Sequence, residues 1–256
     1  MKFSIVTVAY NAASTIADTL TSVVRQKDVE IESIVIDGGS ADETMNVVRS
    51  FGDKLAKVVS EPDRGIYDAM NKGLTLATGD FVGFLNADDY YADENVLRDV
   101  AKTFSAMSTS AVAGAVDQID NKGRIIRMIR AEAHHARRLR WALVPPHPGL
   151  FVKTMMARDA GGFDVGFRIA GDFDLFVRLS RMPGFSLAIL DRTLVKMRIG
   201  GASTAGMGIY LQNSQELKLA LVKNGYSDNN WRVYLRAFRK LPELIPWRRA
   251  VRSENG

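Results

Sequence analysis

Two adjacent carboxylates, Asp88 and Asp89, directly follow an apolar run that has the character of a buried strand. The run covers residues 81–85 and stops at Asn86, so the acidic pair lies where the expected strand ends. Neighbouring carboxylates repel each other unless a cation lies between them. Carboxylate oxygens suit Mg²⁺ or Mn²⁺, which bind one or two carboxylates together with substrate phosphates. The pair therefore indicates a divalent-cation site, and the structural alternative is a capped turn before the next helix.

Polar residues follow three other expected strands in the same way. The apolar runs at residues 3–9, 31–36 and 55–59 have the length and composition of buried strands. The segments that follow them are Tyr10-Asn11, Asp37-Gly38-Gly39 and Glu61-Pro62-Asp63-Arg64. In an open parallel sheet, ligands bind beyond the carboxyl ends of the strands. We therefore expect these polar groups and the acidic pair to gather at one edge of a sheet.

Strand and helix signals alternate along the first part of the chain. Apolar residues recur at helical spacing over 14–26 and 65–77, residues 40–43 have the spacing of a capping box, and a further helix is expected from Asp93. Helices that alternate with apolar, β-branched strands imply a mostly parallel sheet covered on both faces. The sequence predicts an α/β fold with a mostly parallel central sheet flanked by helices.

The pattern changes after residue 110. The expected elements are strands at 111–119 and 124–130 around a turn at 121–123, an irregular segment at 145–148, a helix at 171–181, strands near 186–190 and 194–198, and a glycine-rich loop at 200–206. We predict one domain over residues 1–206, followed by a helical, basic extension over 207–256.

Composition excludes several classes of protein. The chain has 256 residues, of which 46% are hydrophobic and 25% are charged, values typical of globular proteins. It contains no apolar run of 18 residues, so no membrane span is predicted, and residues 1–9 are interpreted as a strand rather than a signal peptide. The absence of cysteine excludes disulfides and thiolate metal sites and fits a cytoplasmic location.

The positive charge is concentrated at the end of the chain. Residues 228–256 contain seven Lys or Arg and three acidic residues, which gives +4 of the net +5. A nucleic-acid-binding protein would carry such charge on the fold itself, so no nucleic-acid partner is expected. Five apolar residues recur at helical spacing in this tail: Trp231, Tyr234, Leu235, Phe238 and Leu241. This stripe either packs on the core or holds the protein at an anionic membrane surface, on the inner face of the cytoplasmic membrane.

Four segments, in their order and spacing, resemble family 2 glycosyltransferases of the GT-A fold. They are SIVTVAYNAASTI, VIDGGSADET, EPDRGIYDAMNKGLTLATGDFVGFLNADD and AGDFDLFVRL. The resemblance extends over residues 3–200 and is strongest to bacterial enzymes that build exopolysaccharides, lipopolysaccharides and glycolipids. It implies an inverting, metal-dependent transfer of a sugar from a nucleotide-diphosphate donor to a saccharide or lipid-linked acceptor.

The resemblance implies roles for the residues that follow the first and fourth strands. Asp89 matches the direct ligand of Mg²⁺ or Mn²⁺, and Asp88 matches the residue shared between the ribose and the metal. A bound cation would stabilise the charge that develops on the departing nucleoside diphosphate. Thr7, Ala9 and Tyr10 match the segment that lies against the nucleobase, although a strand end alone would also account for them.

Two further positions on the donor side carry over from the resemblance. Asp37 matches the acidic nucleotide-binding residue after the second strand. Many relatives have an aspartate that reads uracil where this chain has Gly38, so the resemblance leaves the identity of the base open. Arg64 either neutralises phosphate or forms a surface ion pair.

On the acceptor side, Asp172 matches the acid that deprotonates the acceptor hydroxyl. A positioned carboxylate can take up that proton as the new bond forms, while the structural alternative is an N-cap of the helix that begins there. Asp174 and Arg178 are spaced for an i, i+4 ion pair on that helix. His147 is expected near the acceptor, with a packed or hydrogen-bonded role as its alternative. Arg198 precedes the glycine-rich loop at 200–206, which the resemblance places over the diphosphate, with a plain surface loop as the alternative.

Other classes share parts of this pattern. A dinucleotide-dependent dehydrogenase would carry G-x-G-x-x-G after the first strand, where this chain has no glycine. A sugar nucleotidyltransferase of related fold would carry a glycine-rich, basic loop at that place, which is also missing. An inactive sugar- or nucleotide-binding protein is the third alternative, and the retention of Asp88, Asp89 and Asp172 argues against it.

Overall fold

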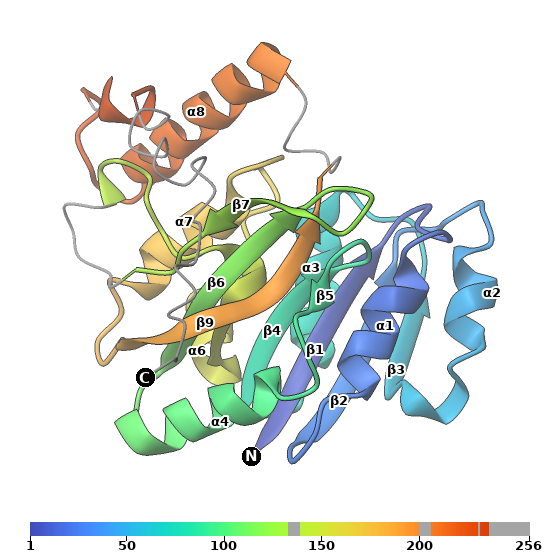
Figure 1. Ribbon diagram of the computed structural model, residues 1–256. Helices are drawn as coiled ribbons and strands as arrows, with labels where there is room; N and C mark the ends of the chain where they lie inside the picture. The colour runs from blue at the N-terminus through green and yellow to red at the C-terminus, as the bar shows by residue number, and fades with distance from the viewer. Residues whose placement is uncertain (133–138, 200–205, 230, 236–256) are drawn as a thin grey trace, which may run out of the picture.

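The computed structural model describes residues 1–132, 139–199, 206–229 and 231–235. Within these residues a nine-stranded sheet has the order β3-β2-β1-β4-β8-β6-β9-β5, and β7 pairs with β6 outside this path. The strands are β1 (Lys2–Ala9), β2 (Glu30–Asp37), β3 (Lys57–Ser60), β4 (Phe81–Asn86), β5 (Tyr90–Tyr91), β6 (Ala111–Ile119), β7 (Ile125–Ile129), β8 (Leu150–Lys153) and β9 (Leu187–Arg198). Figure 1 shows the sheet through the middle of the molecule, with helices on both sides.

The first four strands form the predicted parallel sheet. Strand β1 lies between β2 and β4, and β2 pairs with β3, all in parallel register. Ala9 is opposite Asp37 in this register, and Val8 is opposite Asn86. The carboxyl ends of β1, β2 and β4 therefore lie side by side, which confirms the expected common edge.

Helices cover both faces of this sheet. They are α1 (Ile16–Val24), α2 (Thr44–Arg49), α3 (Ile66–Leu76), α4 (Val96–Met107), α6 (Thr154–Asp159), α7 (Gly171–Leu179) and α8 (Gly206–Lys223). Because side chains alternate along a strand, Phe3 of β1 packs in one buried cluster with Val100 of α4. Val6 packs in another cluster with Met70 of α3 and Phe176 of α7. The mostly parallel α/β fold is confirmed.

Four elements depart from the prediction. Strand β8 pairs antiparallel with both β4 and β6 and was not predicted, nor were β5 and α6. The two strands expected near 186–190 and 194–198 are one strand, β9, which follows β6 in parallel with register shifts between Gly114 and Val116. These register shifts accommodate the extra residues of β9 that lie between the two expected strands.

Two predicted helix starts are also wrong. Residues 40–43 do not form a capping box, because α2 begins at Thr44 and its N-cap, Glu43, makes no side-chain cap bond. Asp42 instead accepts a hydrogen bond from the Thr44 backbone N–H at 3.0 Å. The helix expected from Asp93 begins at Val96, after the short strand β5 and a bend.

The end of the described chain packs on the domain. Leu217 and Leu221 of α8 are buried in the same cluster as Phe176 of α7. Trp231, in a 3₁₀ turn over Trp231–Val233, is 56% exposed. The glycine-rich loop at 200–205 and the apolar positions 238 and 241 lie outside the described residues, so the tail hypothesis stays a prediction. None of the described helices combines the length and the apolar character that crossing a bilayer requires.

Candidate active site

A pocket of about 210 Å³ lies between the carboxyl edge of the parallel strands and the start of α7. Five residues singled out in the sequence line it: Asp88, Asp89, His147, Asp172 and Arg198. They come from the end of β4, from the segment before β8, from α7 and from the end of β9. The fold therefore brings together residues that are far apart in the chain.

Asp89 lies at the bottom of this arrangement and is 1% exposed. Neither of its carboxylate oxygens accepts a hydrogen bond of good geometry from the described residues, and the same is true of the side-chain oxygen of Asn86. Burial raises the pKa of Asp89 well above its usual value, and the neighbouring charge of Asp88 raises it further. Buried oxygens without partners are costly, and a bound cation would remove that cost.

Asp88 is half-buried beside it, and burial also raises the pKa of this carboxyl, with Arg198 opposing the shift. The Arg198 guanidinium donates to the Asp88 backbone oxygen at 3.1 Å and pairs with Asp18 at 2.5 Å. It also lies 5.1 Å from the centroid of the Tyr90 ring. These contacts hold Arg198 beside the acidic pair.

The acidic pair fits a hard divalent cation. No group of three or more His, Asp or Glu side chains within the described residues is arranged to hold a metal. A site for Mg²⁺ or Mn²⁺ does not need one, because these ions bind one or two carboxylates and take their remaining ligands from phosphates and water. Asp88 and Asp89, with the unpartnered oxygen of Asn86 beside them, supply oxygen donors of that kind.

Asp172 faces the pocket from the first turn of α7. It is not the N-cap, which is Ala170 and makes no side-chain cap bond. Its Oδ1 accepts a hydrogen bond from the Phe173 backbone N–H at 2.8 Å. The Tyr67 hydroxyl donates to the Ile169 carbonyl at 2.6 Å and lies 3.5 Å from the same Oδ1. Burial, and then the charge of Asp172, raise the pKa of Tyr67, so its hydroxyl stays protonated and acts as a donor.

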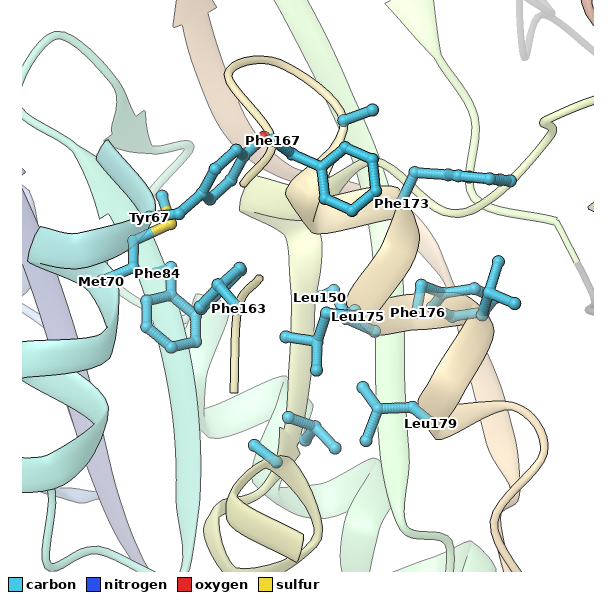
Figure 2. Close-up of a cluster of buried hydrophobic side chains, with 14 of the residues drawn as sticks. Tyr67, Met70, Phe84, Leu150, Phe163, Phe167, Phe173, Leu175, Phe176 and Leu179 are labelled. Carbon is cyan, nitrogen blue, oxygen red and sulfur yellow. The ribbon is translucent and has the colours of Figure 1, made fainter. Parts of the chain in front are cut away.

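Two residues of the pocket lining, Tyr67 and His147, belong to a cluster of packed aromatic rings. The His147 ring stacks on Phe84 with centroids 5.5 Å apart, and Phe163 meets His147 edge-on at the same distance. Tyr67 stacks on Phe163 at 5.6 Å. Figure 2 shows Tyr67, Phe84 and Phe163 gathered between the α3 and α7 parts of the molecule. Burial lowers the pKa of His147, with the charge of Asp172 opposing the shift, so the imidazole is neutral at pH 7.

The ion pair predicted on α7 is confirmed. Arg178 donates to Asp174 Oδ2 through Nε at 2.9 Å and through a terminal nitrogen at 2.8 Å. The guanidinium also donates to the backbone oxygens of Ala160 and Gly162. Asp174 is 2% exposed, so this pair fixes α7 against the preceding loop rather than facing the pocket.

Four residues expected to contact the nucleotide lie in or directly after β1 and β2, outside the pocket lining: Thr7, Ala9, Tyr10 and Asp37. Thr7 and Ala9 are buried inside the sheet, whereas Tyr10 is 67% exposed. Asp37 is fully buried, and its carboxylate accepts from the Gly39 and Ser40 backbone N–H groups and from the hydroxyls of Ser40 and Ser60. It therefore organises the ends of β2 and β3.

Asp63 lies against Gly38 at this end of the edge. A β-carbon at position 38 would collide with Asp63 Oδ2 and would lie 3.5 Å from the Tyr10 ring. The carboxylate therefore occupies space that any side chain at position 38 would need. Arg64 forms an exposed i, i+4 ion pair with Asp68 at 3.1 Å, which is the surface pair that the sequence left as one of two interpretations.

Sequence reasoning missed two side chains that support the pocket. Tyr67 was recognised only as part of a helix, because a tyrosine on an apolar face is the usual pattern of a core residue. Glu216 was missed entirely, although its carboxylate contacts the backbone just before α7. It lies 44 residues after Asp172, in a stretch of α8 that carries no motif.

Known proteins share this chain's sequence pattern. The family described as Glycosyl transferase family 2 matches residues 4–167. An uncharacterised glycosyltransferase of Mycobacterium tuberculosis is 33% identical over 182 residues, which cover 68% of this chain and 67% of the relative. A PGL/p-HBAD biosynthesis glycosyltransferase of Mycobacterium bovis is 30% identical over 185 residues, which cover 71% of this chain and 70% of the relative.

Solved structures share the fold at lower sequence identity. S. aureus TarS in complex with UDP-GlcNAc aligns with a TM-score of 0.68 at 19% identity, over 93% of this chain and 73% of that one. In another TarS structure the match covers 41% of the TarS chain. The mannosyltransferase PcManGT from Pyrobaculum calidifontis, in complex with GDP-Man and Mn²⁺, aligns with a TM-score of 0.65 at 20% identity, over 93% of this chain and 69% of that one.

Proposed function

The chain belongs to glycosyl transferase family 2, and we propose that it inverts the anomeric centre of a sugar as it moves that sugar from a nucleoside diphosphate to an acceptor hydroxyl. The observation that carries this proposal is one pocket lined by Asp88, Asp89 and Asp172. The acidic pair suits the leaving group, and the third carboxylate suits the nucleophile. The acidic pair follows β4 and the third carboxylate lies on α7, so the leaving group and the nucleophile would be contacted from two different elements.

On the donor side, Asp88 and Asp89 are proposed to hold Mg²⁺ or Mn²⁺. When bound, such a cation stabilises the negative charge that develops on the departing diphosphate. Arg198 adds a fixed positive charge at the same end of the pocket, where Asp18 and the Asp88 backbone orient it. A solved neighbour that contains Mn²⁺ with GDP-Man supports this choice of cation.

On the acceptor side, Asp172 is proposed to act as the general base. The acceptor oxygen bonds to the anomeric carbon as the bond from that carbon to the diphosphate oxygen breaks, and Asp172 takes the hydroxyl proton. Within the described residues the Phe173 amide and the Tyr67 hydroxyl both lie on the Oδ1 side of this carboxylate, so Oδ2 is available for the proton. His147 is proposed to shape the apolar floor against which the acceptor packs.

Tyr10 and Asp63 are proposed to contact the base of the donor. An exposed aromatic ring offers a stacking surface for a planar heterocycle, and a carboxylate accepts a hydrogen bond from a ring N–H. Uracil, thymine and guanine carry such an N–H, whereas cytosine and adenine present an acceptor nitrogen that would face the carboxylate. We therefore expect UDP, dTDP or GDP to bind more tightly than CDP or ADP.

The base proposal is tested by calorimetry with these five nucleotides in Mn²⁺. Asp63→Ala removes the carboxylate, and Gly38→Ala displaces it without changing any charge, because the new methyl group would collide with it. Both variants should reduce the discrimination between UDP, dTDP or GDP and the other two nucleotides. Unchanged discrimination in both variants contradicts the role of Asp63.

The acceptor is proposed to be a saccharide or a lipid-linked saccharide. Support comes from a relative that is named for PGL/p-HBAD biosynthesis. The basic residues of 228–256 would bring the enzyme to an anionic membrane surface, where each is worth about 1 kcal/mol. Co-sedimentation with anionic and neutral vesicles tests this: binding should require anionic lipid, weaken with salt and disappear when residues 228–256 are deleted.

The central proposal is tested with a panel of nucleotide-sugars in Mg²⁺ or Mn²⁺, scored for release of nucleoside diphosphate with and without saccharide acceptors. We expect release to depend on the acceptor and on the metal. NMR of the product then reports its anomeric configuration, and retention of configuration would contradict a single displacement. Absence of binding to every nucleoside diphosphate would contradict the donor class as a whole.

A further inference from the structure

A carboxylate from α8 holds the backbone that leads into the proposed base. Glu216 Oε2 accepts hydrogen bonds from three consecutive backbone N–H groups, those of Arg168 at 3.1 Å, Ile169 at 2.8 Å and Ala170 at 3.0 Å. Gln212 donates to the other carboxylate oxygen at 3.2 Å. Successive amides that point at one anion form a compact binding turn. This turn lies at the amino end of α7, where the helix dipole also favours a negative charge.

The opposite side of the same turn is held by α3. The Tyr67 hydroxyl donates to the Ile169 carbonyl at 2.6 Å, while the Ile169 amide is bound by Glu216. At Gly171 a β-carbon would lie 2.7 Å from the Tyr67 ring, so the turn has no room to move toward α3. Both polar groups of one peptide segment are therefore fixed by side chains from different helices, directly before Asp172.

Two further contacts fix α8 against the same region. Lys223 pairs with Asp164 at 2.6 Å. Asn224, directly after α8, donates to Asp174 Oδ1 at 2.9 Å. Because α8 is anchored on either side of the turn, Glu216 acts from a fixed position. The family match ends at residue 167, before this helix.

We propose that Glu216 is a positioning residue for sugar transfer: it fixes the 168–170 turn, and through that turn the orientation of Asp172. This inference rests on the proposed role of Asp172 as general base. Arg168 and Ile169 also line the pocket, so release of the turn would move both the wall and the carboxylate. A displacement of about 1 Å at a reacting group can lower the rate about 10²-fold.

Steady-state kinetics and nucleoside diphosphate affinity of Glu216 variants test the proposal. Glu216→Ala should lower kcat by about 10-fold to 100-fold and leave the affinity for the nucleoside diphosphate unchanged. Glu216→Gln should lower kcat less, because its amide oxygen still accepts from the turn but lacks the charge that strengthens such bonds. Lys218→Ala is the matched control: it removes an α8 ion pair with Asp228 that does not contact the turn, and its kcat should stay near wild type.

A double mutant separates positioning from general stability. If Glu216 acts through Asp172, its substitution should have little further effect once Asp172 is Asn, and the double mutant should have the kcat of Asp172→Asn alone. Multiplicative losses would overturn the proposal, as would wild-type kcat in both Glu216 variants, or equal loss of kcat in Lys218→Ala. A fully active Asp172→Asn enzyme would instead contradict the proposed base, whatever the Glu216 variants do.

Discussion

The two ends of the pocket are built by different means. At the donor end, Asp88 and Asp89 follow a strand whose position is set by parallel pairing with β1, and the backbone ladder alone brings them to the edge. At the acceptor end, Asp172 is positioned by side chains, since Glu216 and Tyr67 hold the turn before it. A site at a strand end inherits the rigidity of the sheet, whereas a site on a turn depends on individual polar contacts that single substitutions remove.

The same difference appears in the electrostatics. Neither oxygen of the buried Asp89 has a hydrogen bond of good geometry among the described residues, and burial raises its pKa well above the usual value. Asp172 is only half-buried and accepts a hydrogen bond from the Phe173 backbone N–H. Under the proposed function, a bound cation would compensate the charge of the acidic pair, whereas Asp172 needs orientation rather than compensation.

The comparison predicts that substitution of Asp89 has the largest effect and removes donor binding. Asp89→Asn keeps the shape of the side chain but removes the charge that a cation requires. We expect turnover to fall by about 10³-fold, the scale of losing a group that stabilises the departing charge, and affinity for the nucleoside diphosphate in Mn²⁺ to fall with it. Calorimetry and a diphosphate-release assay measure the two effects.

The matched control is Asp68→Asn, which removes a half-buried carboxylate outside the pocket lining that pairs with the exposed Arg64. Its turnover should stay within about twofold of wild type, as expected for an exposed ion pair. Removal of divalent cations with a chelator should reproduce the effect of Asp89→Asn in the wild-type enzyme. Full activity in excess chelator would show that the acidic pair does not work through a metal.

The second prediction separates the two ends. Asp172→Asn should lower kcat by about 10² or more, the usual contribution of a general base, while nucleoside diphosphate binding stays at the wild-type level. Asn can still accept the Phe173 amide, so the turn of α7 should keep its structure. Loss of donor binding in this variant would mean that the two ends of the pocket are not independent.

The contrast between the two ends of the pocket also explains which parts of the site the sequence could predict. Apolar runs that end in acids, together with the parallel sheet they imply, were enough to bring Asp88 and Asp89 to a common edge. The turn before Asp172 could not be predicted in this way, because its contacts come from Glu216 and Tyr67, far away in the chain. Strand β8 was missed for a related reason: its four residues follow an irregular segment and give too short a pattern.

The third prediction concerns the weaker of the two contacts on the turn. Tyr67→Phe removes the hydroxyl that donates to the Ile169 carbonyl and keeps the ring that stacks on Phe163. A hydrogen bond of this kind is worth about 1 kcal/mol, so kcat should fall by about fivefold. Tyr226→Phe, a hydroxyl deletion outside the pocket, should have no effect on kcat, and equal losses in both variants would indicate a general loss of stability.

The smallest predicted effect concerns the stability of the fold, and its sign differs between Asp89 and the control residue Asp68. The pKa of Asp89 is raised, so its contribution to folding is present below the usual value of 3.8 and is lost as pH rises through the raised pKa. At pH 7.5 in chelator, Asp89→Asn should therefore melt about 2 °C or more above wild type. The gain should shrink as pH falls toward 4, because the wild-type carboxyl then takes up its own proton.

The Asp68→Asn variant makes the sign of this prediction testable in the same experiment. Arg64 lowers the pKa of Asp68, so this carboxylate stabilises the fold above pH 4, and its loss should not raise the melting temperature. Scanning fluorimetry of both variants between pH 4 and pH 8, with and without Mn²⁺, measures the difference. Added Mn²⁺ should stabilise the wild type and Asp68→Asn but not Asp89→Asn, because only the first two keep the acidic pair. A lower melting temperature for Asp89→Asn in chelator would contradict the view that this buried carboxylate opposes folding until a cation binds it.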